Sequence, residues 1–161
     1  MVVLGIDPGY ATVGYGVIDH RANQSRLVAY GAVTTDPGLP LARRLSEIYD
    51  DVITLIQTYK PDSACVEELF FNTNVKTAIQ VGHARGVILL ACQKCNLEPF
   101  EYTPLQVKQA VVGYGRAEKR QVMEMVRVML KLDTIPRPDD AADALAIAIC
   151  HAHSSMSRLN M

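Results

Sequence analysis

The first third of the chain consists of short apolar runs separated by polar or turn residues, a pattern typical of strands. One run covers residues 2–7 and ends at the turn pair Pro8-Gly9, and two more cover residues 13–19 and 27–35. The links between these runs are too short for a parallel crossover, which needs roughly a dozen residues or more. The three segments therefore predict an antiparallel meander.

The remaining residues alternate between helical and strand patterns. Apolar positions recur at helical spacing in the longer segments, and two short apolar segments lie between them. The predicted helices cover residues 39–59, 74–96, 104–112, 117–132 and 139–152, and the predicted further strands cover residues 63–67 and 98–102. This order predicts an α/β fold with a five-stranded mixed sheet and helices on both faces. The length of 161 residues is usual for one domain, so we expect a single domain over residues 1–161.

Charge is distributed unevenly along the chain, although the formal net charge is only −1. Residues 103–137 include seven basic and three acidic residues, so this segment carries a net +4 and the rest of the chain −5. Binding of a polyanion depends on a local basic face more than on the total charge. The composition is therefore compatible with a nucleic-acid partner that contacts this segment.

No segment of the sequence predicts secretion or insertion into a membrane. The N-terminus lacks the basic start of a signal peptide, and the longest apolar run, residues 144–150, is too short to cross a bilayer. Cys92 and Cys95 form a lone pair without matching ligands, so we interpret them as helix residues one turn apart and assign no metal to them. We expect a cytoplasmic protein.

Three aspartates occupy positions where a site could form. Asp7 ends the first strand beside a tight turn, where an aspartate that accepts backbone hydrogen bonds is an alternative interpretation. Asp140 and Asp143 share one face near the start of the last helix, although Asp140, like Asp139, could simply stabilise the helix N-terminus. Asp143 lies among alanines that let the helix pack closely on the sheet, and no base nearby in sequence compensates its charge. A cation would supply that compensation.

Glu67 and Glu68 end the fourth strand, and strand alternation sends their side chains to opposite faces. Only one of them can share a site with Asp7, and the alternation does not decide which. If the first and fourth strands are neighbours, their ends bring the two carboxylates together, because ligand sites lie at strand ends in open α/β sheets. A site with only oxygen ligands favours Mg²⁺ or Mn²⁺, and a pair of such ions supports phosphoryl displacement. The pattern indicates metal-dependent phosphodiester hydrolysis.

Six segments form a distinctive series along the chain, namely residues 5–9, 12–17, 66–70, 82–86, 106–108 and 140–146. In this order they resemble segments of the RuvC family of Holliday junction endonucleases. The resemblance covers nearly the whole chain, and the combination is more specific than any single motif. It implies a ribonuclease H-like fold, in which a five-stranded mixed sheet is flanked by helices.

The resemblance also implies a mechanism and partners. It assigns the catalytic and metal-binding roles to Asp7, Glu67, Asp140 and Asp143, and so favours Glu67 over Glu68. It implies Mg²⁺ as cofactor, with Mn²⁺ able to substitute, and two ions per active site when DNA is bound. A homodimer would cut a four-way junction symmetrically and leave 5′-phosphate and 3′-hydroxyl ends, in recombination and repair. The RuvA–RuvB branch-migration complex is the implied protein partner.

Five further residues are candidates for DNA contacts. Phe70 matches a family aromatic residue that stacks on an unpaired base, whereas the alternative is a core phenylalanine. Lys108 and Lys119 match family positions that contact phosphate, and the alternative is a pair of solvated helix lysines. Arg116 and Arg120 are additional candidates in the same basic segment, with solvated side chains as the alternative.

Other interpretations account for parts of the pattern. Sugar kinases and actin-like ATPases also open with a strand that ends in an aspartate, but they need a second, similar domain. Other nuclease-like domains would not explain the basic cluster around Lys108 and Arg120, and a binding module without activity would not need all four carboxylates.

Gly82 and Gly86 allow close helix packing, either in a dimer interface or within the chain.

Overall fold

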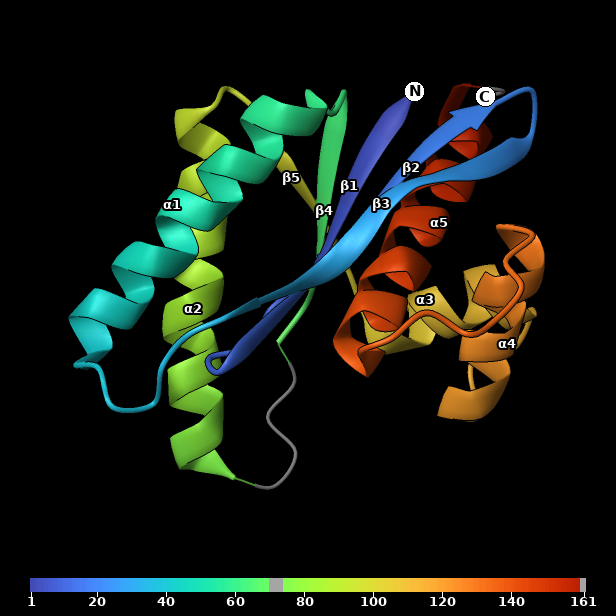
Figure 1. Ribbon diagram of the computed structural model, residues 1–161. Coiled ribbons are helices and arrows are strands. Elements are labelled where there is room, and N and C mark those ends of the chain that lie inside the picture. The colour runs from blue at the N-terminus through green and yellow to red at the C-terminus, as the bar shows by residue number, and fades with distance from the viewer. Residues whose placement is uncertain (70–73, 160–161) are drawn as a thin grey trace.

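A computed structural model of the chain describes residues 1–69 and 74–159. Its strands are β1 (Val2–Asp7), β2 (Thr12–Arg21), β3 (Gln24–Thr34), β4 (Ser63–Glu67) and β5 (Pro99–Tyr102). They form one sheet in the order β3-β2-β1-β4-β5. β1, β2 and β3 pair in antiparallel fashion, and β4 is parallel to both β1 and β5. The predicted meander and the predicted mixed sheet are both confirmed (Figure 1).

Helices cover both faces of this sheet, as predicted. They are α1 (Leu41–Tyr59), α2 (Val75–Lys94), α3 (Pro104–Val112), α4 (Lys119–Met129) and α5 (Asp139–Leu159). α1 and α2 pack on one face, and α5 packs on the other with α3 and α4 outside it (Figure 1). Each face has its own apolar core, because the buried side chains alternate along the central strands. In the described part of the chain, no helix combines the length and apolarity needed to cross a membrane.

The hairpin between β2 and β3 is tighter than the sequence suggests. Arg21 pairs with Gln24, and the two residues between them, Ala22 and Asn23, have φ angles of 48° and 64°. Two-residue hairpin turns of type I′ have positive φ values at both central positions, a conformation that asparagine tolerates but alanine rarely adopts. Both strands therefore extend through positions that the sequence pattern indicated as a polar loop.

Local contacts set the starts of α4 and α5, and α4 starts later than the predicted residue 117 whereas α5 starts at the predicted residue 139. α4 begins at Lys119, because Glu118 occupies the position before the helix and its backbone N–H donates to Gln121 Oε1 over 2.8 Å. α5 begins at Asp139, but the carbonyl of Pro138 accepts the hydrogen bond from the backbone N–H of Ala141 over 3.0 Å. Asp139 is thus the first helical residue and leaves its carboxylate free for other contacts.

α5 lies so close to β1 and β2 that only glycine fits at three strand positions, Gly5, Gly14 and Gly16, which we call the glycine seam. A methyl group on Gly14 would lie 2.0 Å from the carbonyl oxygen of Asp140, and one on Gly5 would lie 2.1 Å from that of Ala144. Backbone atoms cannot yield to such a contact without movement of the helix. The glycine seam therefore sets the start of α5 directly over the end of β1.

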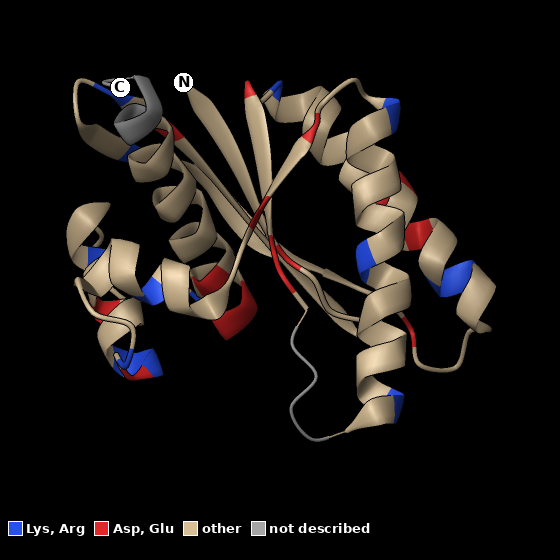
Figure 2. Cartoon of the chain, turned by 180° about the vertical axis from the view of Figure 1, so that it is seen from behind, with Lys and Arg blue, Asp and Glu red and all other residues tan. Residues whose placement is uncertain are grey.

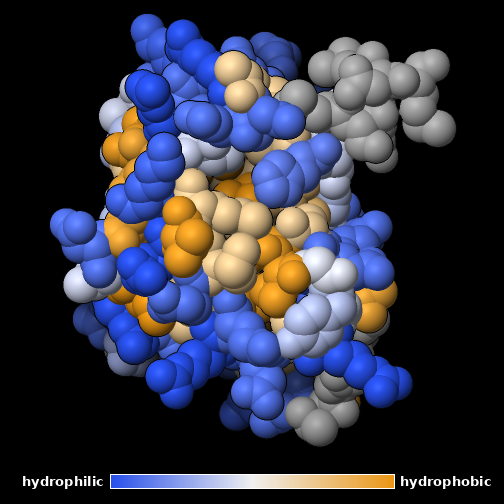
Figure 3. All heavy atoms as spheres, turned by 90° about the vertical axis from the view of Figure 1, so that its right-hand side faces the viewer, coloured by the Kyte–Doolittle hydropathy of each residue, from blue (hydrophilic) through white to orange (hydrophobic). Residues whose placement is uncertain are grey.

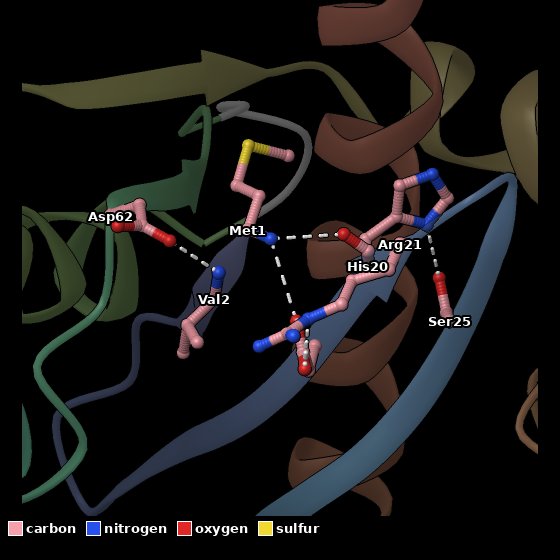
Figure 4. Close-up of polar contacts among 7 residues, drawn as sticks. Met1, Val2, His20, Arg21, Ser25 and Asp62 are labelled. Carbon is pink, nitrogen blue, oxygen red and sulfur yellow. Dashed lines mark hydrogen bonds and ion pairs between the residues drawn. The ribbon is translucent and has the colours of Figure 1, made fainter.

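The opposite end of β1 is tied to its neighbours by polar contacts (Figure 4). The Val2 backbone N–H donates to Asp62 Oδ2 over 2.6 Å, and the N-terminal ammonium of Met1 donates to the His20 carbonyl over 3.0 Å. These bonds join β1 to β2 and to the residue that precedes β4. The central strands are thus held at both ends, which fixes where their carboxyl ends lie.

Candidate active site

Four acidic residues from three elements meet at one end of the sheet. Asp7 ends β1 and Glu67 ends β4, and the preceding residues, Ile6 and Val66, are partners in the parallel ladder. Asp140 lies in the first turn of α5 and Asp143 one turn later, above these strand ends. Figure 2 shows acidic segments where the central strands end and where α5 starts, with basic positions on α3 and α4 beside them.

Charges within this group of carboxylates raise the pKa values of Asp7, Glu67 and Asp143. The pKa of Asp7 is raised to about 8, mainly by burial and then by the charges of Asp143, Glu67 and Asp140 in that order of importance. The pKa of Glu67 is raised by burial and by Asp143. Burial also raises the pKa of Asp143, with an added contribution from Asp140. The cluster carries more negative charge than its surroundings compensate.

One cation does reach the cluster. Lys119 Nζ lies 3.0 Å from Asp143 Oδ2 and 3.9 Å from Asp139 Oδ2. Burial acts to lower the pKa of Lys119, but the hydrogen bond and charge of Asp143 raise it overall. No base close to Asp143 in sequence compensates its charge, but Lys119 does so from 24 residues away, because the fold brings it close.

The residue types in the cluster fit a divalent cation. Carboxylate oxygens are the donors that Mg²⁺ and Mn²⁺ prefer. Within residues 1–69 and 74–159, however, no three His, Cys, Asp or Glu side chains are arranged to hold one ion. The Lys119 ammonium lies 3.0 Å from Asp143 Oδ2, beside the carboxylates that would hold such an ion.

Arg85 holds the backbone of Glu67 in place through a hydrogen bond. Its Nε donates to the Glu67 backbone carbonyl over 3.2 Å, and its Nη2 lies 2.8 Å from Glu101 Oε2 on β5. The side chain is only 17% exposed, so both contacts are partly shielded from water. Sequence reasoning gave Arg85 no role, because its partners are distant in sequence. The only signal was its place in the segment of residues 82–86 that resembles the family.

Arg44 supports the turn that follows Asp7. This buried arginine on α1 donates from Nε to Thr35 Oγ1 over 2.8 Å and stacks 3.8 Å from the centre of the Tyr10 ring. Its Nη2 also donates to the Tyr10 carbonyl over 3.4 Å. The loop between β1 and β2 is thereby fastened to α1. The sequence offers no sign of this role, which sequence reasoning missed.

The predicted DNA contacts fall into three groups. Lys108 and Lys119 line a cleft of about 250 Å³ together with Glu67 and Asp143. Arg116 and Arg120 are exposed near the start of α4 and do not line that cleft. The predicted stacking residue Phe70 lies outside the described residues. The structure therefore brings the two lysines to the carboxylates and leaves the two arginines at the surface beside them.

Gly86 has no packing partner in the described part of the chain. A methyl group on this glycine would meet nothing within 4 Å, whereas one on Gly82 would make an ordinary 3.9 Å contact with Leu69. Val75, Ile79 and Leu90 are exposed on the same helix. Of the two roles considered for the glycine pair, packing within the chain does not account for Gly86.

Known proteins resemble this chain over almost its full length. Residues 3–151 match the family described as "Crossover junction endodeoxyribonuclease RuvC". Proteins of that description from Alkaliphilus oremlandii and Rubrobacter xylanophilus are 56% and 61% identical over 96% and 95% of this chain, and over 94% and 86% of their own lengths.

Solved structures agree. The Thermus thermophilus RuvC structure matches with a TM-score of 0.89 at 39% identity, covering 98% of this chain and 97% of that one. The same protein in complex with a Holliday junction substrate matches with a TM-score of 0.90 at 37% identity, covering 98% and 96%. The predicted ribonuclease H-like fold is thereby confirmed. The chain belongs to the RuvC family of crossover junction endodeoxyribonucleases.

Proposed function

We propose that this chain is a structure-selective DNA endonuclease that resolves Holliday junctions by paired, symmetric cuts in homologous recombination and DNA repair. The observation that carries the proposal is the acidic cluster at the ends of β1 and β4, flanked by lysines from α3 and α4. A related protein that covers the same length has been solved with a Holliday junction substrate, which supports the choice of substrate.

Asp7, Glu67, Asp140 and Asp143 would hold Mg²⁺, with Mn²⁺ able to substitute and two ions present when DNA is bound. Such ions, when bound, activate a water molecule and stabilise the attacking and leaving oxygens. Hydrolysis that breaks the bond to the 3′ oxygen leaves 5′-phosphate and 3′-hydroxyl ends. The raised pKa of Asp7 supports this assignment, because a buried acidic cluster is stabilised by added positive charge.

The two lysines would bind phosphate groups of the DNA substrate. Lys119 pairs with Asp143, and a phosphate group entering the cleft would offer its ammonium an alternative anionic partner. Lys108 lines the same cleft and adds a second phosphate contact. Arg116 and Arg120 would extend the positive surface along the DNA away from the cut site.

The active form would be a homodimer of single-domain subunits. A two-fold dimer suits a four-way junction, because each subunit then meets one of two equivalent strands. The exposed apolar face of α2, formed by Val75, Ile79, Gly86 and Leu90, supports this assignment. The family makes the RuvA–RuvB complex the expected protein partner, and a cytoplasmic location is part of this proposal.

Cleavage assays test the proposal. The protein is incubated in Mg²⁺ with a synthetic four-way junction, a linear duplex of the same sequence and an RNA–DNA hybrid. We expect paired cuts in the junction and little cutting of the other two. Cleavage of the hybrid without cutting of the junction would refute junction resolution and favour a ribonuclease.

A second test uses the variant Asp143→Asn, which removes one negative charge and keeps the side-chain shape. This variant is expected to lose cutting while it still binds the junction in EDTA. If it instead fails to fold, Asp143 is a structural residue and the assignment of its chemical role is wrong.

A further inference from the structure

A groove of about 510 Å³ lies between the first half of β3 and the end of α4. Its floor is the far half of α5, where Ile149 and His153 line it. His153 follows Asp140 by 13 residues on this helix, which corresponds to about 20 Å at the helical rise. The groove is therefore at the opposite end of the molecule from the acidic cluster.

The base of the groove is apolar. Leu27, Met129, Leu130 and Ile149 line it, and Leu130 and Ile149 belong to the buried core beneath. Figure 3 shows apolar atoms gathered in the middle of the face that carries α4 and the β2–β3 hairpin, with hydrophilic residues around them. A groove with this lining accepts apolar side chains, which a nucleic-acid backbone does not offer.

One wall of the groove is the open edge of the sheet. β3 is an edge strand that pairs only with β2 among the described strands, so half of its backbone hydrogen-bonding groups face away from the sheet. A register shift at Val28 interrupts the ladder, which leaves Gln24–Leu27 as a short, regular segment beside the groove. An extended peptide can add to such an edge as a further strand.

This edge is already ordered. The tight turn at Ala22 and Asn23 begins the strand, and His20 Nδ1 lies 2.8 Å from Ser25 Oγ across the hairpin (Figure 4). A partner strand would thus meet a preformed edge and would not need to order it. Preformed edges reduce the entropy lost on binding.

The basic residues that line the groove favour an acidic partner. Arg26 contributes to one wall and Lys131 to the other, and no carboxylate lines the groove. Among the described residues neither base takes part in an ion pair. We propose that this groove binds a short, extended acidic peptide of a partner protein, which pairs with β3 and places apolar side chains on the groove floor.

The proposal does not rest on the nuclease function, because the groove shares no lining residue with the cleft at the acidic cluster. It can therefore be tested on the metal-free protein. The probe is a blocked hexapeptide that alternates glutamate with valine or leucine, and its counterpart carries lysine in place of each glutamate. Binding is followed by ¹⁵N–¹H NMR of the full chain.

The acidic peptide is expected to give saturable shifts of the backbone amides of Gln24–Leu27 and of Ile149, and to bind more weakly as salt is added. The double variant Arg26→Glu/Lys131→Glu should lower the affinity by about tenfold or more and bind the lysine peptide instead, because like charges then face each other. The variant Arg43→Glu/Lys94→Glu changes the net charge equally on exposed sites away from the groove and should bind like the unaltered protein.

Three results would overturn the proposal. The β3 amides do not respond to the acidic peptide, or the two peptides bind equally well to the unaltered protein. Alternatively, a short DNA duplex shifts the same amides more strongly and displaces the peptide, in which case the groove is a nucleic-acid surface. Amide spectra of the variants outside the groove establish that the fold is kept in each comparison.

Discussion

At the scale of single residues, Asp7 links the acidic cluster to the stability of the fold. Its pKa is raised from an ordinary value of 3.8 to about 8 by burial and by the neighbouring carboxylates. Between these two pH values the folded protein holds a proton on Asp7 that the unfolded chain has released. Stability then falls as pH rises through this window, because the unfolded state binds fewer protons than the folded state.

Asp7→Asn removes this titration while it keeps the shape of the side chain. In EDTA, the unaltered protein should lose stability between pH 5 and pH 8, with a limit of about 1.4 kcal/mol per pH unit from Asp7 alone. The variant should lose less stability over this pH range, so that its unfolding free energy increasingly exceeds that of the unaltered protein as pH rises. Urea denaturation at four pH values measures this difference, and parallel curves for the two proteins would contradict the raised pKa.

At the scale of elements, α5 presents its small residues to the sheet and the sheet presents its glycines to α5. Ala141 and Ala144 are fully buried, and the Asp140 carbonyl lies over Gly14. This close approach is what brings an aspartate from a helix to the ends of two strands. A bulkier contact would lift the start of α5 and separate Asp140 and Asp143 from Asp7.

Gly14→Ala tests this packing. The added methyl group would lie 2.0 Å from a backbone oxygen, so the variant should be destabilised by about 1–3 kcal/mol, typical of overpacking. The rate of junction cleavage should fall by more than the loss of folded protein explains, because Asp140 moves with the helix. Urea denaturation and cleavage rates measure the two effects.

The matched control for this prediction is Gly86→Ala, where the methyl group meets nothing within 4 Å in the described chain. It should be neutral or stabilise α2 by up to about 1 kcal/mol. Measurements at several protein concentrations separate this effect from any change in self-association. Equal losses in both variants would mean that an added methyl group is destabilising in general, and that close packing against α5 does not explain the need for glycine at position 14.

At the scale of the whole molecule, much of the architecture could be predicted from local patterns. Apolar runs and their short links predicted the antiparallel meander, and the helical periods predicted both outer layers. The remaining features depend on contacts between distant residues, such as Lys119 with Asp143 and Arg85 with the Glu67 carbonyl. No local pattern encodes these pairs, because each requires two elements to be placed first.

The assembly is the other property at this scale. Ile79 is 52% exposed on the apolar face of α2, and Val128 is 50% exposed on α4, away from that face. Ile79→Glu should convert the proposed dimer to a monomer and replace paired cuts by single nicks, because a buried charge opposes association. Val128→Glu is the control and should remain dimeric.

Light scattering after size-exclusion chromatography measures the mass of each variant, and a nicked junction is distinguished from a resolved one on native gels. A monomeric mass for the unaltered protein at micromolar concentration would rule out the dimer. A monomeric Val128→Glu variant would instead move the interface to α4.

The glycine seam also constrains how this sequence can diverge over evolutionary time. Gly14 is required by the distance between a strand and a helix, whereas Asp143 is required only if the site performs chemistry. A descendant that kept the fold for binding alone would be free to replace the aspartate but would retain the glycine. In a mutational scan selected for folding, position 14 should stay depleted of substitutions while position 143 accepts them. The two positions therefore record separate histories, one of architecture and one of catalysis.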